Sequence, residues 1–189
     1  MNSLVLFLIP LIVAFNARMY PLSKDLGFNN HSHGQEEVYK EIEFENTYRN
    51  YISGKGAVVA VIDTGCETTH EDLKENIAYA YNVITKDNNV CDIDGHGTNV
   101  AGIISASDNN VGLVGVAPDA KLCIIKTMRD GNNFFSYYDV IKAINKAVDL
   151  GYVNVINLSI GGYYDDDKLK EALNRAREKA GMDADQYIQ

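Results

Sequence analysis

Short apolar runs alternate with amphipathic stretches over most of the chain after Ala57. Four runs rich in β-branched or aromatic residues predict strands at residues 57–63, 77–83, 121–126 and 153–159. Helices are predicted at residues 96–106, 136–150 and 167–180, the second with apolar side chains at helical spacing between Ser136 as N-cap and Gly151. Strands alternating with helices predict an α/β fold with a parallel sheet, whose active residues collect at the carboxyl ends of the strands.

The region before these elements has a different pattern. Residues 4–15 (LVLFLIPLIVAF) form a nearly unbroken apolar run that is too short to cross a bilayer comfortably. We interpret residues 1–17 as a segment that suits a signal peptide, although no Lys or Arg precedes the run. The alternatives are a buried strand or a misplaced start of the reading frame. Residues 18–50 are polar and predict a linker. The signal-peptide interpretation favours secretion over a cytoplasmic location.

Composition bounds the class of protein. At 189 residues with 46% hydrophobic content, the chain has room for one globular domain with a core. A net charge of −9 argues against a nucleic-acid partner, whose phosphates attract basic surfaces. The three cysteines, Cys66, Cys91 and Cys123, form neither a disulfide framework nor a CxxC metal motif. We expect Cys66 and Cys123 to be packed core side chains.

Two segments carry candidate catalytic chemistry, VVAVIDTG ending at Gly65 and DGHGTNVAGI beginning at Asp94. Asp63 ends a predicted buried strand, where a carboxylate can accept the Nδ1 proton of an imidazole and fix its tautomer. His96 opens a predicted helix, whose positive end disfavours the protonated ring and thereby favours a neutral general base. We expect Gly102 to let this helix pack closely.

The segments VIDTG, HEDL, DGHGTNVAG, VGLVGVAPDAKL and VINLSIGG resemble, in order and spacing, the subtilisin-type serine proteases. DTGCETTHEDLK is similar to the intracellular branch of that family. The resemblance implies a three-layer α/β fold with helices on both faces of a parallel sheet, in a partial peptidase domain at residues 51–181. It also implies polypeptide substrates, with Asp63 as the orienting aspartate and His96 as the general base.

The resemblance assigns two further groups of residues. Ser159, Ile160 and Gly161 of LSIGG match the segment that pairs with the substrate backbone, a β-augmentation mode of binding. Asp72 and Asn109 match side-chain ligands of a structural Ca²⁺ site, whose shell backbone carbonyls would complete. The N-terminal ligand of that site has no identifiable match, so calcium stays an open alternative.

The resemblance stops near Ala180, and residues 182–189 are an unrelated polar tail. The family's oxyanion asparagine and its Gly-Thr-Ser-Met-Ala nucleophile have no counterpart in the chain. We therefore expect a truncated serine endopeptidase that is inactive alone. The alternative is a non-catalytic peptide-binding half-domain, a decoy or one half of a split protease. The missing next strand predicts an exposed edge at residues 153–159, through which the chain would associate.

Overall fold

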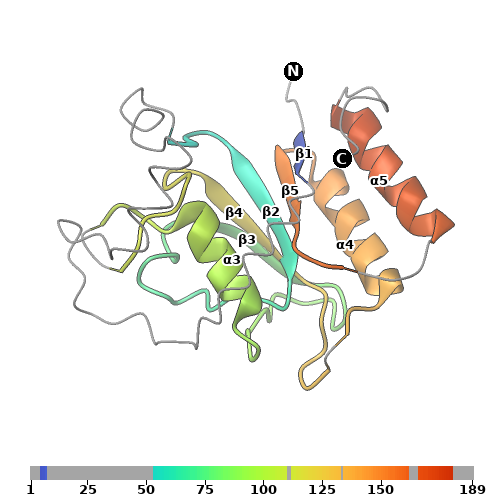
Figure 1. Cartoon of the computed structure of the whole chain (residues 1–189), viewed down its shortest axis with the longest axis horizontal. Coiled ribbons are helices and arrows are strands. Elements are labelled where there is room, and N and C mark those ends of the chain that lie inside the picture. The colour runs from blue at the N-terminus through green and yellow to red at the C-terminus, as the bar shows by residue number, and fades with distance from the viewer. Residues whose placement is uncertain (1–4, 8–52, 110–111, 133, 162–165, 181–189) are drawn as a thin grey trace.

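The computed structural model describes residues 5–7, 53–109, 112–132, 134–161 and 166–180. Five parallel strands form one sheet in the order β1-β5-β2-β4-β3 (Figure 1). The strands are β1 (Val5–Phe7), β2 (Val58–Asp63), β3 (Ile77–Asn82), β4 (Lys121–Lys126) and β5 (Val155–Leu158). The helices are α3 (His96–Ser105), α4 (Tyr137–Leu150) and α5 (Asp167–Ala180). The predicted strands after Ala57 and the three predicted helices are thus confirmed, with boundaries that differ by two residues at most.

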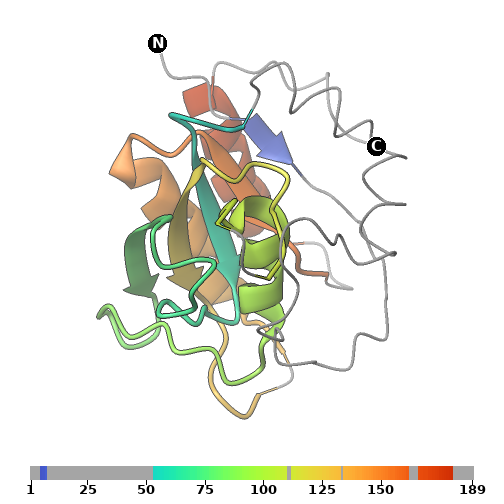
Figure 2. The ribbon, with the colours of Figure 1, turned by 90° about the vertical axis from the view of Figure 1, so that its left-hand side faces the viewer.

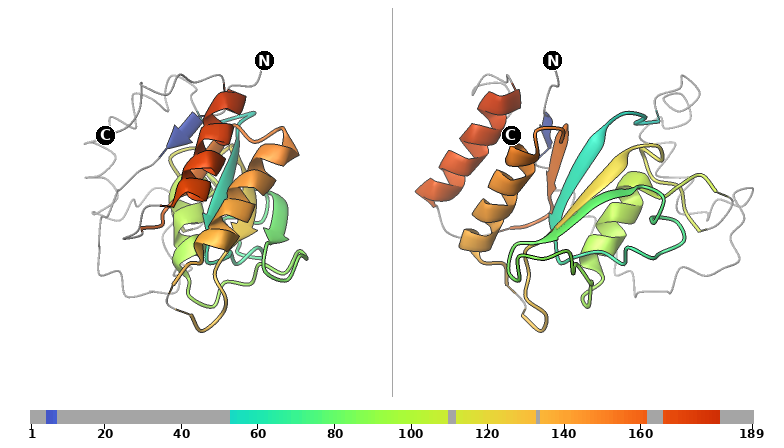
Figure 3. Two further views of the ribbon diagram at one scale, coloured as in Figure 1. Left: turned by 90° about the vertical axis from the view of Figure 1, so that its right-hand side faces the viewer. Right: turned by 180° about the vertical axis from the view of Figure 1, so that it is seen from behind.

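Helices cover both faces of the sheet, which confirms the three-layer arrangement (Figures 1, 2 and 3). Alternate residues of the buried strands point to opposite faces, so each strand contributes to two separate cores. Val61 and Ile124 pack with α3 on one face, whereas Ile62 and Ile125 pack with α4 and α5 on the other. The central strand β2 is buried from Val59 to Asp63 and therefore holds its last residue firmly.

Helix α4 begins and ends where its sequence signals place it. Ser136 is the N-cap residue, but its side chain makes no capping hydrogen bond; its carbonyl instead accepts the amides of Asp139 and Val140. Gly151 ends the helix in the left-handed conformation that favours glycine. The helix boundaries predicted from the sequence are therefore confirmed, whereas the side-chain hydrogen bond typical of an N-cap serine is absent at Ser136.

The expectation that β5 forms an open edge is wrong over Val155–Asn157. Val5–Phe7 of the N-terminal apolar run pairs with these residues as a parallel strand. Part of that run thus forms a strand, at the edge of the sheet, and removal of residues 1–17 as a signal peptide would also remove β1. Association of another chain along β5 would have to displace β1, because both would use the same backbone groups.

The predicted linker, peptidase-like region and tail are only partly covered by the described residues. The linker at residues 18–50 and the tail at residues 182–189 lie outside the described residues. The peptidase-like region, predicted at residues 51–181, is described from Ser53 to Ala180 apart from the gaps given above. None of the helices in the described parts of the chain is long and apolar enough to span a bilayer.

Candidate active site

Asp63 ends β2 at the carboxyl end of the sheet, with only 1% of its surface exposed. Its Oδ1 accepts a hydrogen bond from the Thr64 amide at 2.7 Å and contacts Nδ1 of His96, also at 2.7 Å. Its Oδ2 has no hydrogen-bond partner among the described residues. The structure thus brings together the two predicted catalytic residues, which are 33 positions apart in sequence.

His96 opens α3 directly after Gly95, whose φ of 89° lies in the left-handed region. A carboxylate can only accept, so Nδ1 of His96 donates to Asp63 and the other ring nitrogen, Nε2, carries the acceptor role in the neutral ring. The side chain is 48% exposed, so one side of the ring faces solvent while the other is fixed on the carboxylate. The site therefore holds an oriented imidazole that is open to a reactant.

The ionisation of His96 differs from the expectation based on the helix end. The hydrogen bond from His96 to Asp63 raises the pKa of His96 above its ordinary 6.5, and the charges of Asp63, Asp94 and Asp92 add to this against the lowering effect of burial. The prediction of a neutral ring favoured by the helix dipole is thus wrong in direction. Carboxylates close to the ring outweigh the partial charge at the end of α3.

The start of α3 packs directly on the turn that follows Asp63. A Cβ atom on Gly97 would lie 2.2 Å from the Gly65 carbonyl oxygen and 3.1 Å from the Asp63 Cβ. Gly102, the glycine predicted to permit close packing, has no neighbouring atom within 4 Å of the place where a Cβ would lie. The close approach that brings His96 onto Asp63 therefore depends on Gly97, and the prediction for Gly102 is wrong.

Asp92 links the two halves of the site and was not identified from the sequence. Its carboxylate accepts hydrogen bonds from the Thr64 hydroxyl at 2.8 Å, the Gly95 amide at 2.9 Å and both the amide and hydroxyl of Thr98. Burial alone would raise the pKa of Asp92, but the hydrogen bonds from Thr98, Gly95 and Thr64 together hold the pKa below its usual value. An Asp three positions before a Gly at a helix start is the signal that could have indicated this role.

The predicted substrate-binding residues lie at the same end of the sheet as Asp63. Leu158 pairs with Ile62 in the β5–β2 register, so Ser159 follows β5 at the level where Asp63 ends β2. The Ser159 hydroxyl accepts a hydrogen bond from the Asn157 side chain at 3.0 Å. Ile160 is partly buried against the core, and Gly161 is exposed. The β5–β2 register therefore places residues 159–161 at the end of the sheet where Asp63 lies. Their role in substrate binding stays a prediction.

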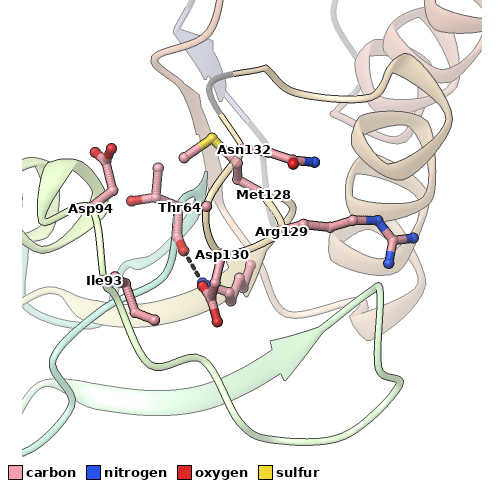
Figure 4. A pocket seen from close by; sticks show the side chains of 9 residues that line it. Thr64, Ile93, Asp94, Met128, Arg129, Asp130 and Asn132 are labelled. Atoms are coloured by element: carbon pink, nitrogen blue, oxygen red, sulfur yellow. Dashed lines mark hydrogen bonds and ion pairs between the residues drawn. The ribbon is translucent and has the colours of Figure 1, made fainter.

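A cavity of about 160 Å³ lies beside the Asp63 turn (Figure 4). The loop that follows β4 forms one wall, and Thr64 and Asp94 lie on the opposite side. The lining residues are Thr64, Ile93, Asp94, Lys126, Met128, Arg129, Asp130, Gly131 and Asn132. The cavity shares Thr64 with the turn that holds Asp63, so it opens next to the candidate catalytic pair.

The two residues predicted to bind a cation lie away from this pair. Asp72 is 1% exposed; its Oδ1 has no hydrogen-bond partner among the described residues, and its Oδ2 receives the Leu113 amide at 3.3 Å. A Cβ atom on Gly112 would lie 2.0 Å from this Oδ2. Asn109 is exposed, and its side-chain amide donates to the Glu71 carbonyl at 3.4 Å. Asp72, in the segment between β2 and β3, and Asn109, in the loop between α3 and β4, thus belong to two segments that meet around a buried carboxylate.

The cysteines behave as expected from their sequence context. Cys66 and Cys123 are buried, and burial raises the pKa of each thiol to about 12. Such thiols stay protonated at neutral pH and react slowly as nucleophiles. All three cysteines are free, and Cys91 is exposed.

Comparison with known proteins agrees with this geometry. Residues 54–186 match the family model described as the subtilase family. The chain is 41% identical over 144 residues to the major intracellular serine protease of Bacillus subtilis (strain 168), covering 74% of this chain and 45% of that protein. It is 32% identical over 138 residues to the minor extracellular protease Epr of the same organism, covering 73% of this chain and 21% of that protein. Matching relatives thus include intracellular and extracellular proteases.

Structural comparison gives the same family. The crystal structure of fervidolysin from Fervidobacterium pennivorans, described as a keratinolytic enzyme related to subtilisin, matches with a TM-score of 0.63 and 34% identity. The match covers 69% of this chain and 21% of that chain. The chain spans less than half the length of the relatives it matches. Because the family model covers most of the chain and the fold agrees, the protein belongs to the subtilase family.

Proposed function

We propose that this chain supplies the aspartate and the histidine of a serine-protease relay that cleaves peptide bonds in polypeptides. The observation that carries the proposal is the 2.7 Å contact between His96 Nδ1 and Asp63 Oδ1. An imidazole fixed through Nδ1 can use Nε2 to take the proton of an attacking hydroxyl and later return it to the leaving amine. Asp63 would stabilise the imidazolium formed between these steps, without itself taking the proton.

The nucleophile must come from outside these 189 residues under this proposal. Two serine hydroxyls have other partners: Ser105, at the end of α3 opposite His96, donates to the Ala120 carbonyl at 2.7 Å, and Ser159, which follows β5, accepts the Asn157 side-chain amide. The serine would belong either to a longer polypeptide or to a separate chain, and the 189 residues alone would be inactive. In subtilisin, the reference case for this effect, loss of the serine alone lowers kcat on the order of 10⁶-fold.

Substrate would lie along Ser159, Ile160 and Gly161. These residues follow β5, and the parallel register places them at the sheet end where Asp63 lies. An extended peptide can form backbone hydrogen bonds with such a segment, while pockets select its side chains. The position of the segment supports this role because a peptide bound there would pass close to the Asp63–His96 pair.

A structural Ca²⁺ ion would bind at Asp72, with Asn109 as a second side-chain ligand. The buried Oδ1 of Asp72 without a described partner is the kind of hard oxygen donor that Ca²⁺ prefers. The described residues contain no cluster of three or more His, Cys, Asp and Glu side chains that could hold a metal, so carbonyl and amide oxygens would complete the shell. Bound calcium would neutralise the buried carboxylate and fasten the loop between α3 and β4.

The proposed pairing predicts the direction of a pKa change. Asp63→Asn is expected to lower the pKa of His96, because the largest contribution that raises it comes from the Asp63 hydrogen bond. Asp94→Asn is the matched control, since it removes the same charge beside the ring without removing the contact. Histidine titration by nuclear magnetic resonance measures both. An equal effect of the two substitutions, or no effect of Asp63→Asn, would count against the relay.

The sign of the linked stability follows from the same shift. A histidine whose folded-state pKa is raised stabilises the fold below its unfolded pKa of about 6.5, and that contribution is lost as pH rises through the folded-state pKa. The free energy of unfolding of the wild-type chain, measured with denaturant, should therefore decrease as pH rises above about 6.5. In Asp63→Asn this decrease with pH should be smaller.

A further inference from the structure

Lys126 places a buried ammonium group next to the candidate catalytic pair. It is the last residue of β4 and pairs across the sheet with Asp63. Its side chain is 5% exposed. Its Nζ donates to the carbonyl of Thr64 at 2.6 Å, the carbonyl of Cys91 at 2.8 Å and Oδ1 of Asp130 at 2.8 Å. Each of the three ammonium protons can therefore be matched to an acceptor.

Burial of this ammonium is costly unless those acceptors are held in place. An ammonium moved from water into a protein interior loses several kcal/mol even after the protein relaxes. The preceding residues of β4, Leu122 to Ile125, are apolar and fully buried. An apolar side chain at position 126 would continue this pattern at lower cost. The lysine therefore contributes something that an apolar residue could not, namely bonds to particular backbone groups.

The two carbonyls that it binds belong to the two segments that carry the catalytic pair. Thr64 follows Asp63, and its amide donates to Oδ1 of Asp63 at 2.7 Å. Cys91 precedes Asp92, whose carboxylate accepts the Gly95 amide at 2.9 Å directly before His96. Lys126 and Thr64, which this bond joins, both line the cavity beside the Asp63 turn. One ammonium thus joins the turn after Asp63 to the loop that leads into His96.

We propose that Lys126 is a positioning residue that keeps the Asp63 turn and the His96 loop at the separation their hydrogen bond requires. This inference rests on the proposed relay function. Lys126 acts through Thr64 and Cys91, whose carbonyls it binds, and not through the ring of His96. Asp92 connects the same two segments through its own side-chain hydrogen bonds, so Lys126 and Asp92 each contribute a separate link between them.

Replacing Lys126 by methionine tests the proposal through the pKa of His96. Loss of the positive charge alone would raise this pKa, because a nearby cation disfavours the imidazolium. Loss of the Asp63 contact would lower it, and we expect the pKa to fall toward 6.5. Asp63→Asn should then have little further effect in the Lys126→Met background. A pKa that rises or stays constant in Lys126→Met would overturn the proposal.

Lys121 offers a matched control on the same strand. Its Nζ donates to the Glu75 carbonyl at 2.7 Å and to Oδ1 of Asn76 at 3.0 Å, at the opposite end of β4. Lys121→Met removes the same charge and similar bonds, but neither partner belongs to the catalytic segments. We expect no lowering of the His96 pKa in this variant. A shift equal to that of Lys126→Met would mean a general loss of strand stability and would contradict the positioning role.

A measurement on the wild-type chain decides the question if Lys126→Met does not fold. Ammonium protons held by three buried acceptors exchange slowly with water, so the Lys126 ammonium should give a resolved proton–nitrogen resonance at neutral pH where the exposed Lys121 does not. Its absence would overturn the proposal. If Asp63→Asn leaves the His96 pKa unchanged, the relay proposal itself fails; if only Lys126→Met does so, the relay stands and the positioning inference fails.

Discussion

Replacing Gly97 with alanine is expected to destabilise the fold by about 1–3 kcal/mol, as overpacking of a filled site does. The added methyl group would lie 2.2 Å from the Gly65 carbonyl oxygen, a backbone atom that cannot rotate away. Relief requires movement of α3 away from the Asp63 turn. The same movement would lengthen the His96–Asp63 contact, so the pKa of His96 should fall together with the stability.

Gly102→Ala is the control for this effect because it lies on the same helix. Nothing lies within 4 Å of its Cβ position, so alanine adds helix propensity without a clash. We expect it to stabilise the fold by about 0.5–1 kcal/mol. Urea unfolding of both variants provides the comparison. Equal stability of the two alanine variants would show that α3 does not depend on close approach at Gly97.

Addition of Ca²⁺ is expected to raise the free energy of unfolding, by about 2.7 kcal/mol at a free concentration of 100 times Kd. The reason is that the ion would bind the folded loop around Asp72 and not the unfolded chain. Asp72→Asn removes the carboxylate whose Oδ1 has no described partner, and should abolish the gain. Thermal melts with added calcium and with a chelator measure the difference.

The neighbouring Glu71 supplies the control for calcium binding. Glu71 is exposed, so Glu71→Gln changes the net charge equally without altering the buried carboxylate. This variant should keep the full calcium-dependent gain. Melting temperatures of wild type that do not respond to calcium, or an equal loss in both variants, would contradict the proposed site.

The elements of this fold were predictable because their signals are local. The buried strand that ends at Asp63 is a continuous β-branched run, and α4 has apolar side chains at helical spacing and a terminal glycine. The Asp63–His96 pairing was predictable from motif order, although the two residues are far apart in sequence. Each of these features depends on short segments whose side-chain chemistry is specific.

The remaining features depend on which segments meet in space. The pairing of Val5–Phe7 with β5 joins residues about 150 positions apart, and the apolar run alone was compatible with a leader peptide, a strand or a misplaced start. Gly97 and Gly102 lie on the same short helix, but only one meets another backbone. Lys126 is a charged residue ending an apolar strand, and its role depends on two carbonyls supplied by other segments. Sequence patterns do not encode such contacts locally.

The ionisation of His96 shows how a correct principle can be outweighed. The start of a helix does disfavour a cation, but that field comes from partial charges. Asp63 contacts the ring directly, and Asp94 and Asp92 add full charges nearby. The sequence placed Asp63 beside the ring, but the structure adds the charges of Asp94 and Asp92 and shows that the pKa of His96 is raised.

Fluorophosphonate labelling of the purified 189-residue chain, followed by mass-spectrometric mapping, separates a half-relay from a complete one. A half-relay carries the Asp63–His96 pair of a subtilase without a serine that the pair activates. We predict no labelled serine under conditions in which subtilisin is fully labelled. Labelling of any serine in this chain that is lost in His96→Ala would show an internal nucleophile and contradict the half-relay.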